Sequence, residues 1–138
     1  RAAARALARL CFAEMAKVTA IQHDGVDTLV ELLRDPDAEI RAAALGALMG
    51  VTTVDEGKKA MVPAGGVPML ITLLSDPSRL VRLNAVKTVA NVAAFPTIRQ
   101  AYMEDPAALK ALTLLERGED DLLARHAGVA KRVVLWTP

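Results

Sequence analysis

The sequence contains few of the residues that usually carry chemistry. Its 138 residues include one cysteine, Cys11, and two histidines, His23 and His126. A lone cysteine excludes a disulfide within the chain and fits a reducing compartment. The two histidines have no cysteine or further histidine at ligand spacing, so we expect no metal. Cys11 is therefore interpreted as a small buried apolar group.

Aromatic residues are also scarce, and neither sign of charge dominates. Aromatics make up 3% of the chain, whereas hydrophobic residues, many of them alanine, make up 53%. The formal net charge of +1 lacks the basic excess that is typical of nucleic-acid-binding proteins. No apolar run reaches the ~20 residues that a membrane-spanning helix needs. We therefore expect closely packed helices and neither nucleic acid nor a membrane as partner.

Catalytic and phosphate-binding motifs are missing as well. Glu119, Asp120 and Asp121 form a carboxylate cluster, but they precede an expected helix, whose N-terminus they favour. Acid–base catalysis would need such groups in a pocket with shifted pKa values. The pair Gly65-Gly66 lacks the Lys and Ser or Thr of a phosphate-binding loop. The sequence thus predicts no enzyme, no catalytic residue and no cofactor.

What the chain does contain is an internal repeat of about 41 residues. Gly25-Val26 recurs as Gly66-Val67, and Asp35-Pro36 recurs as Asp76-Pro77. A period near 40 is typical of armadillo and HEAT repeats. The repeat therefore predicts an all-α fold, a right-handed armadillo/HEAT-type α-solenoid of three-helix units.

The unit from Asp55 to Ala94 shows the expected three helices. They span about Glu56–Val62, Val67–Ser75 and Leu80–Ala93, and Pro-Gly and Asp-Pro-Ser corners separate them. Apolar residues recur at helical spacing in the last two. The expected inward positions are Val67, Leu70, Ile71, Leu74, Val81, Ala85, Val86, Val89 and Val92.

Two further units, 14–53 and 96–136, follow the same plan. Residues 1–12 fit only the last helix of a preceding repeat. A repeat cannot bury its apolar face alone, so neighbours must stack on it. We therefore expect residues 1–138 to form a single solenoid that is the C-terminal piece of a longer one.

The stretch Gly65–Leu74, together with Val81-Arg82 and Ala85–Ala93, resembles an armadillo repeat. Its Gly-Gly-apolar-Pro corner separates armadillo units from most HEAT units, whereas the stretch 37–41 is HEAT-like. The resemblance implies a protein that binds extended peptides or other proteins. It also implies that the binding surface is the concave face formed by the third helices.

Import adaptors of this family carry a Trp and, four residues later, an Asn on each third helix, and these hold a basic peptide. Asn91 stands where that Asn belongs, but Lys87 replaces the Trp. The equivalent pairs in the earlier units are Arg5 and Arg9, then Gly46 and Gly50. Because the Trp–Asn ladder is absent, the resemblance does not extend to basic-peptide binding.

The third helices still supply the best binding candidates. The predicted concave-face residues are Arg5, Arg9, Gly46, Gly50, Asn84, Lys87, Asn91 and Arg132. Their basic members would attract an acidic segment, and the alternative is a solvated face with scattered charges. Because glycine within a helix costs ~0.5–1 kcal/mol relative to alanine, Gly46 and Gly50 either admit a partner or are tolerated by packing. Trp136 is either a partner-facing anchor or a cap on the last apolar layer.

The stretch Arg125–Ala130, with Val133 and Trp136–Pro138, resembles the C-terminus of the armadillo proteins of ciliary radial spokes. This resemblance implies a structural subunit that braces other proteins within a large assembly. It also implies a cytoplasmic, cytoskeletal location in the axoneme of a cilium or flagellum. The alternative function is a soluble, catenin- or import-adaptor-like protein that binds an extended acidic peptide in its concave groove.

Overall fold

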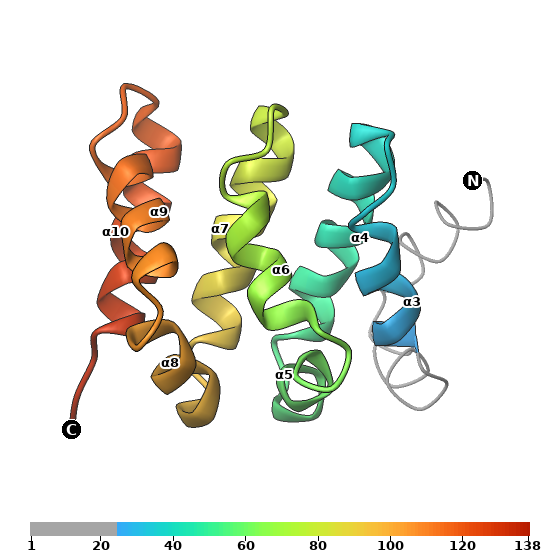
Figure 1. Cartoon of the computed structure of the whole chain (residues 1–138), viewed down its shortest axis with the longest axis horizontal. Helices are drawn as coiled ribbons and strands as arrows, with labels where there is room; N and C mark the ends of the chain where they lie inside the picture. Colours follow the sequence, from blue (N-terminus) through green and yellow to red (C-terminus); the bar gives the residue numbers. More distant parts are fainter. Residues whose placement is uncertain (1–24) are drawn as a thin grey trace. The chain divides into compact units, whose positions relative to one another are not determined.

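The computed structural model describes residues 25–138, and all regular structure within that range is helical (Figure 1). The predictions for residues 1–24, including the helix expected over 1–12 and the candidates Arg5 and Arg9, concern residues outside the described range. The described helices are α3 Gly25–Leu32, α4 Ala38–Val51, α5 Asp55–Met61, α6 Gly66–Leu73, α7 Arg79–Val92, α8 Pro96–Met103, α9 Pro106–Glu116 and α10 Asp121–Val134. No helix in this part of the chain is long and apolar enough to cross a membrane.

The three helices expected between residues 55 and 94 correspond to α5, α6 and α7, with bounds that differ by one or two residues. Eight of the nine expected inward positions are buried, and Val67 is partly exposed. The chain divides into two compact units between Met69 and Leu70, within α6. The first unit holds α3, α4, α5 and the start of α6, and the second holds the remaining helices.

In the first unit, α3 packs against both α4 and α5. Four leucines of this unit have no exposed surface: Leu29 of α3, Leu33 directly after it, and Leu45 and Leu48 of α4. Gly57 of α5 is also buried, because α5 lies directly against the end of α4. A methyl group placed on Gly57 would lie 2.0 Å from the carbonyl oxygen of Val51.

The repeated Asp-Pro corners have a shared structural explanation. In the first unit, Arg41 Nη1 donates to the carbonyl oxygens of Asp35 at 2.9 Å and Pro36 at 3.0 Å. In the second unit, Arg82 Nη1 donates to the equivalent carbonyl oxygens at 2.8 and 3.1 Å. These arginines therefore pair with the carbonyl groups of the corner that joins two helices. Their recurrence therefore reflects the corner and not a partner.

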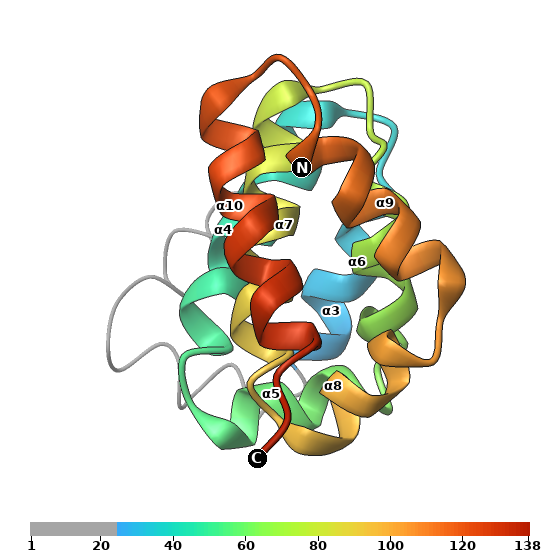
Figure 2. The same ribbon diagram turned by 90° about the vertical axis from the view of Figure 1, so that its left-hand side faces the viewer.

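In the second unit, α10 packs against α7, α9 and α8 (Figure 2). The core contains residues of all four helices, among them Val89, Tyr102, Leu112 and Ala130. Burial, and then the charge of Asp105, raise the pKa of the Tyr102 hydroxyl far above its usual range. The four helices therefore share one apolar core.

An ion pair fixes the start of α10 against the start of α7. The Arg79 guanidinium donates to both carboxylate oxygens of Asp120, and Nη2 lies 3.1 Å from Oδ1. Asp120 is also the N-cap of α10, since its side chain accepts from the backbone N–H of Leu123 at 3.2 Å. The hydrogen bond from Arg79, followed by that from Leu123, lowers the pKa of Asp120 to about 2. The carboxylate cluster of the sequence thus begins a helix.

Candidate functional site

The described part of the chain contains six of the predicted concave-face residues. They are Gly46 and Gly50 of α4, Asn84, Lys87 and Asn91 of α7, and Arg132 of α10. The two glycines belong to the first unit. Gly46 is buried, which favours tolerance by packing over contact with a partner, whereas Gly50 is partly exposed. Its carbonyl oxygen accepts from the Thr53 hydroxyl at 2.8 Å.

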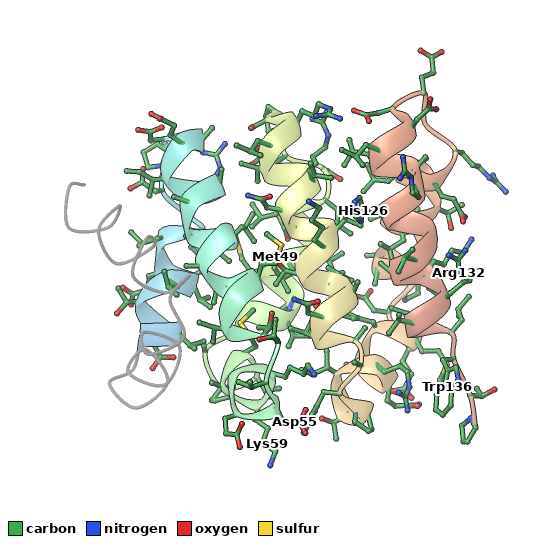
Figure 3. All side chains as sticks on the ribbon, turned by 180° about the vertical axis from the view of Figure 1, so that it is seen from behind. Met49, Asp55, Lys59, His126, Arg132 and Trp136 are labelled. Carbon is green, nitrogen blue, oxygen red and sulfur yellow. The ribbon has the colours of Figure 1, made fainter. Side chains whose placement is uncertain are left out.

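In the second unit, Lys87 of α7 lies close enough to His126 of α10 to lower the pKa of the histidine. Burial lowers the pKa of His126, and the positive charges of Lys87 and Arg125 lower it further. Figure 3 shows His126 on the side of α10 that faces α7. Asn84 and Asn91 are partly exposed on α7, and the Asn84 carbonyl oxygen accepts from the Thr88 hydroxyl at 2.7 Å. Counted from the helix caps Ser78 and Asp120, His126 is the equivalent of the predicted residue Asn84, and it is a neighbour of Lys87.

Acidic residues are nearly absent from these two helices. Helix α7 contains no Asp or Glu, and α10 contains only Asp121, in its first turn. Lys87, Arg125 and Arg132 form no ion pair with any described residue. The surface of α7 and α10 therefore carries three cations that form no ion pair within residues 25–138.

Arg132 lies one helical position away from the place that the period assigns to it. The period of about 41 residues aligns Arg132 with Asn91. However, the helix caps Ser78 and Asp120 lie one residue further apart than that period, because the last corner is longer. Counted from the caps, Val133 is the equivalent of Asn91. The alignment of Arg132 with Asn91 is therefore wrong.

The Arg132 guanidinium lies over Gly128 and beside a carboxylate of α9. A methyl group placed on Gly128 would be 3.7 Å from Arg132 Nη1 and 3.1 Å from Glu116 Oε2. Figure 3 shows His126, Arg132 and Trp136 in succession along α10 and its C-terminal end. Arg132 is thus exposed on the same helix as His126 but on a different part of its surface.

A pocket of 430 Å³, here called the Trp136 pocket, opens beside α10. Its lining residues are Ala94, Arg99, Val129, Arg132, Val133 and Trp136. The Arg99 guanidinium lies 5.0 Å from the centre of the Trp136 ring, within cation–π range. The Trp136 side chain is 56% exposed, which disagrees with a cap buried in the last layer and fits an anchor. The lining contains two cations and no carboxylate.

A second pocket, of 480 Å³, involves other residues of α10. Its lining residues are Glu116, Gly128, Lys131, Arg132, Leu135 and Trp136. Here the charges are paired, because Lys131 Nζ lies 3.3 Å from Glu116 Oε1. The two pockets thus differ in the charge that they offer to a ligand.

The Trp136 pocket was not predicted from the sequence. Its residues come from the end of α7, from α8 and from α10, and Arg99 is remote from Trp136 in the sequence. One signal was present, since Val129, Val133 and Trp136 recur at the spacing of one helix face. We name the combined surface of Lys87, His126 and the Trp136 pocket the α7–α10 face.

Groups suited to catalysis or metal binding do not converge on this face. Among residues 25–138, no three His, Cys, Asp or Glu side chains lie close enough to hold a metal ion. Of the described groups with a shifted pKa, Asp120 and Arg79 pair with each other and Tyr102 is buried in the core. His126 alone belongs to the α7–α10 face, where it has cationic neighbours and no carboxylate among them.

Two repeat families match parts of the sequence. Residues 55–94 match the Armadillo/beta-catenin-like repeat, and residues 1–48 match a HEAT-like repeat. The first match covers the unit expected to be armadillo, and the second includes the HEAT-like stretch 37–41. A comparison with curated proteins gives no match. The chain therefore contains armadillo- and HEAT-type repeats.

Solved structures support the same fold. An engineered protein from the Northeast Structural Genomics Consortium superposes with a TM-score of 0.86 and 32% identity, over 96% of this chain and 54% of that one. A computationally designed armadillo repeat protein for modular peptide recognition gives 0.84 and 27%, over 93% and 55%. A designed armadillo repeat protein in complex with the peptide (KR)4 gives 0.83 and 26%, over 94% and 55%.

The chain spans about half the length of these designed proteins. Together with the helices of the described residues, they confirm the all-α armadillo-type solenoid fold that the period predicted.

Proposed function

We propose that this chain of armadillo- and HEAT-type repeats is a non-enzymatic scaffold that binds an acidic segment of another protein on its α7–α10 face. The observation that carries this proposal is the unbalanced charge of the face. Lys87 and Arg132 form no ion pair with a described residue, although Glu116 of α9 lies near Arg132, and α7 has no acidic residue. A ligand with carboxylates would supply the missing charge and would be steered to the face.

The designed armadillo proteins support peptide binding, but the charge of the peptide bound by one of them differs from the charge proposed here. One of them was solved in complex with the peptide (KR)4, which is basic. The α7–α10 face presents lysine, histidine and arginine, so like charges would repel such a peptide. We therefore propose an acidic ligand in place of a basic one.

Charge reversal on the face tests this proposal. An acidic peptide and a basic peptide of equal length are titrated against the chain by isothermal calorimetry at low and at moderate salt. The acidic peptide is expected to bind, and Lys87→Glu to weaken binding about tenfold, or about 1.4 kcal/mol. The matched control is Lys110→Glu, on the exposed surface of α9, which makes the same charge change away from the face. Equal effects of the two variants, or preference for the basic peptide, would contradict the proposal.

A narrower proposal concerns where the scaffold acts. We propose that it is a structural subunit of the ciliary or flagellar radial spoke, in the axoneme. Support comes from the resemblance of Arg125–Ala130, Val133 and Trp136–Pro138 to radial-spoke armadillo proteins. In that setting, the exposed side chains of Leu135 and Trp136 would be covered by neighbouring subunits.

Fractionation of axonemes separates this location from the alternative, an adaptor that binds its peptide reversibly. Axonemes are extracted with salt, and the fractions are probed for the protein and for spoke subunits. Co-fractionation with spokes is expected. A pool that is wholly released before the spokes would reject the structural role and would favour the adaptor.

A further inference from the structure

The lining of the Trp136 pocket combines four apolar side chains with two cations. Ala94, Val129, Val133 and the Trp136 ring supply the apolar surface. Val129 is 40% exposed and Trp136 is 56% exposed, so this apolar surface faces solvent. Attraction of carboxylates does not require exposed apolar surface, so this apolar surface indicates a further contact with the ligand.

We propose, as a refinement that rests on the proposed function, that the Trp136 pocket is an anchor subsite. It takes one large apolar side chain of the acidic segment, while Arg99 and Arg132 bind carboxylates of the residues that flank this side chain.

The size of the pocket suits an anchor. Its 430 Å³ falls within the ~300–1,000 Å³ that ligand pockets usually occupy. The pocket is a shallow depression that is open to solvent, so a side chain can enter it from the surface. Exposed tryptophans that fill or border a pocket are frequent among the residues that dominate binding energy. Trp136 is therefore placed to contribute more than any single charge of the face.

The two arginines define the chemistry on either side of the anchor. Arg99 is held over the Trp136 ring at 5.0 Å, which orients its guanidinium before a ligand arrives. Arg132 is exposed and has no ion pair among the described residues. Guanidinium groups bind carboxylates with two parallel hydrogen bonds, so both favour Asp or Glu beside the anchor.

The neighbouring pocket of 480 Å³ is the weaker candidate for this role. Its Glu116 already pairs with Lys131 at 3.3 Å, and a ligand carboxylate would compete with that ion pair. Leu135 is its main aliphatic side chain. Charge complementarity with an acidic segment therefore selects the Trp136 pocket.

The single tryptophan of the chain reports directly on this site. Titrations follow Trp136 fluorescence with two acetylated, amidated hexapeptides, EDELDE and EDESDE, which have equal charge and differ only in the central side chain. Saturable binding of EDELDE with a change in Trp136 emission is expected, and EDESDE should bind about tenfold more weakly. Each measurement is repeated by calorimetry, which needs no fluorescent reporter.

Variants assign the effect to the pocket. Val129→Asp places a carboxylate among the apolar groups and should abolish the preference for EDELDE over EDESDE. Arg99→Gln should weaken both peptides at least fivefold, whereas the matched control Arg117→Gln, just after α9, should leave both unchanged. Val129 and Arg117 are exposed, so circular dichroism should show a folded protein in each case.

The outcomes separate this inference from the proposed function. Equal binding of EDELDE and EDESDE, with both weakened by Lys87→Glu, would overturn the anchor subsite and leave acidic binding intact. No binding of either peptide would overturn both. A third outcome concerns nucleic acid, because bases also stack on tryptophan beside arginine. The anchor subsite would be overturned as well if a single-stranded thymidine oligonucleotide bound saturably, changed Trp136 fluorescence and displaced EDELDE.

Discussion

Replacement of Gly57 by alanine should destabilise the protein, although the same change usually stabilises a helix. Alanine within a helix gains ~0.5–1 kcal/mol over glycine. At Gly57 the added methyl group would lie 2.0 Å from the carbonyl oxygen of Val51 and 2.8 Å from its carbonyl carbon. Both are backbone atoms, which cannot rotate away as a side chain can, so α5 must move away from the end of α4.

Overpacking of this kind costs ~1–3 kcal/mol. After subtraction of the helix gain, Gly57→Ala should lower the free energy of unfolding by about 1–2 kcal/mol. Urea unfolding followed by far-ultraviolet circular dichroism measures this difference.

Gly128→Ala is the matched control for this measurement. The nearest atom to its methyl group would be Glu116 Oε2 at 3.1 Å, at the end of a side chain that can rotate. Its stability should stay within ~0.5 kcal/mol of wild type or exceed it. A Gly57→Ala protein as stable as wild type would refute the close contact of α5 with α4.

Three further predictions concern the second unit. Because burial, and then Lys87 and Arg125, keep the pKa of His126 below its ordinary value of 6.5, the unfolded chain binds this proton at higher pH. The free energy of unfolding should therefore fall as the pH drops through about 6.5. His126→Gln should reduce this fall, measured as the urea midpoint at each pH. A pH profile identical to that of wild type would contradict the role of His126. Asp120, with its pKa lowered to about 2 mainly by the Arg79 hydrogen bond, contributes stability above pH 3.8 that is lost as pH falls toward 2. In Asp120→Asn that acid-dependent loss, measured by thermal unfolding, should shrink. Tyr102→Ala should cost ~3–5 kcal/mol in urea unfolding, because the side chain is 1% exposed; a cost below ~1 kcal/mol would refute its place in the core.

Much of the fold could be predicted because the repeat reflects local physics. The Asp-Pro corners recur with an arginine six residues after the Asp, and in both units that arginine donates to the carbonyl oxygens of the corner. Apolar spacing identified inward positions such as Val81 and Val89, both fully buried. Such features depend on neighbours in the sequence, so the sequence reveals them.

The site was less predictable because it depends on contacts between helices. Lys87 was selected by its register, but its neighbour His126 comes from another repeat. The additional residue before the cap Asp120 can be read from the sequence, and it places Val133, in place of Arg132, at the position equivalent to Asn91. The meeting of Arg99 with Trp136 required the packing of α8 against α10, which the period does not specify.

Gly57 shows a different limit of the sequence. From the sequence alone, a glycine within a short helix predicts a small loss of helix stability. Its role as a close contact depends on the position of the Val51 carbonyl group. No pattern of apolar residues encodes that distance.

Backbone amide NMR of the chain during titration with EDELDE tests the central claim most directly. If an acidic segment binds the α7–α10 face, amide shifts should concentrate at Lys87, His126 and Val129, and the Trp136 indole N–H should move with the same saturation curve. Shifts confined to the first unit, or no shifts at peptide concentrations that saturate calorimetric binding, would contradict the account.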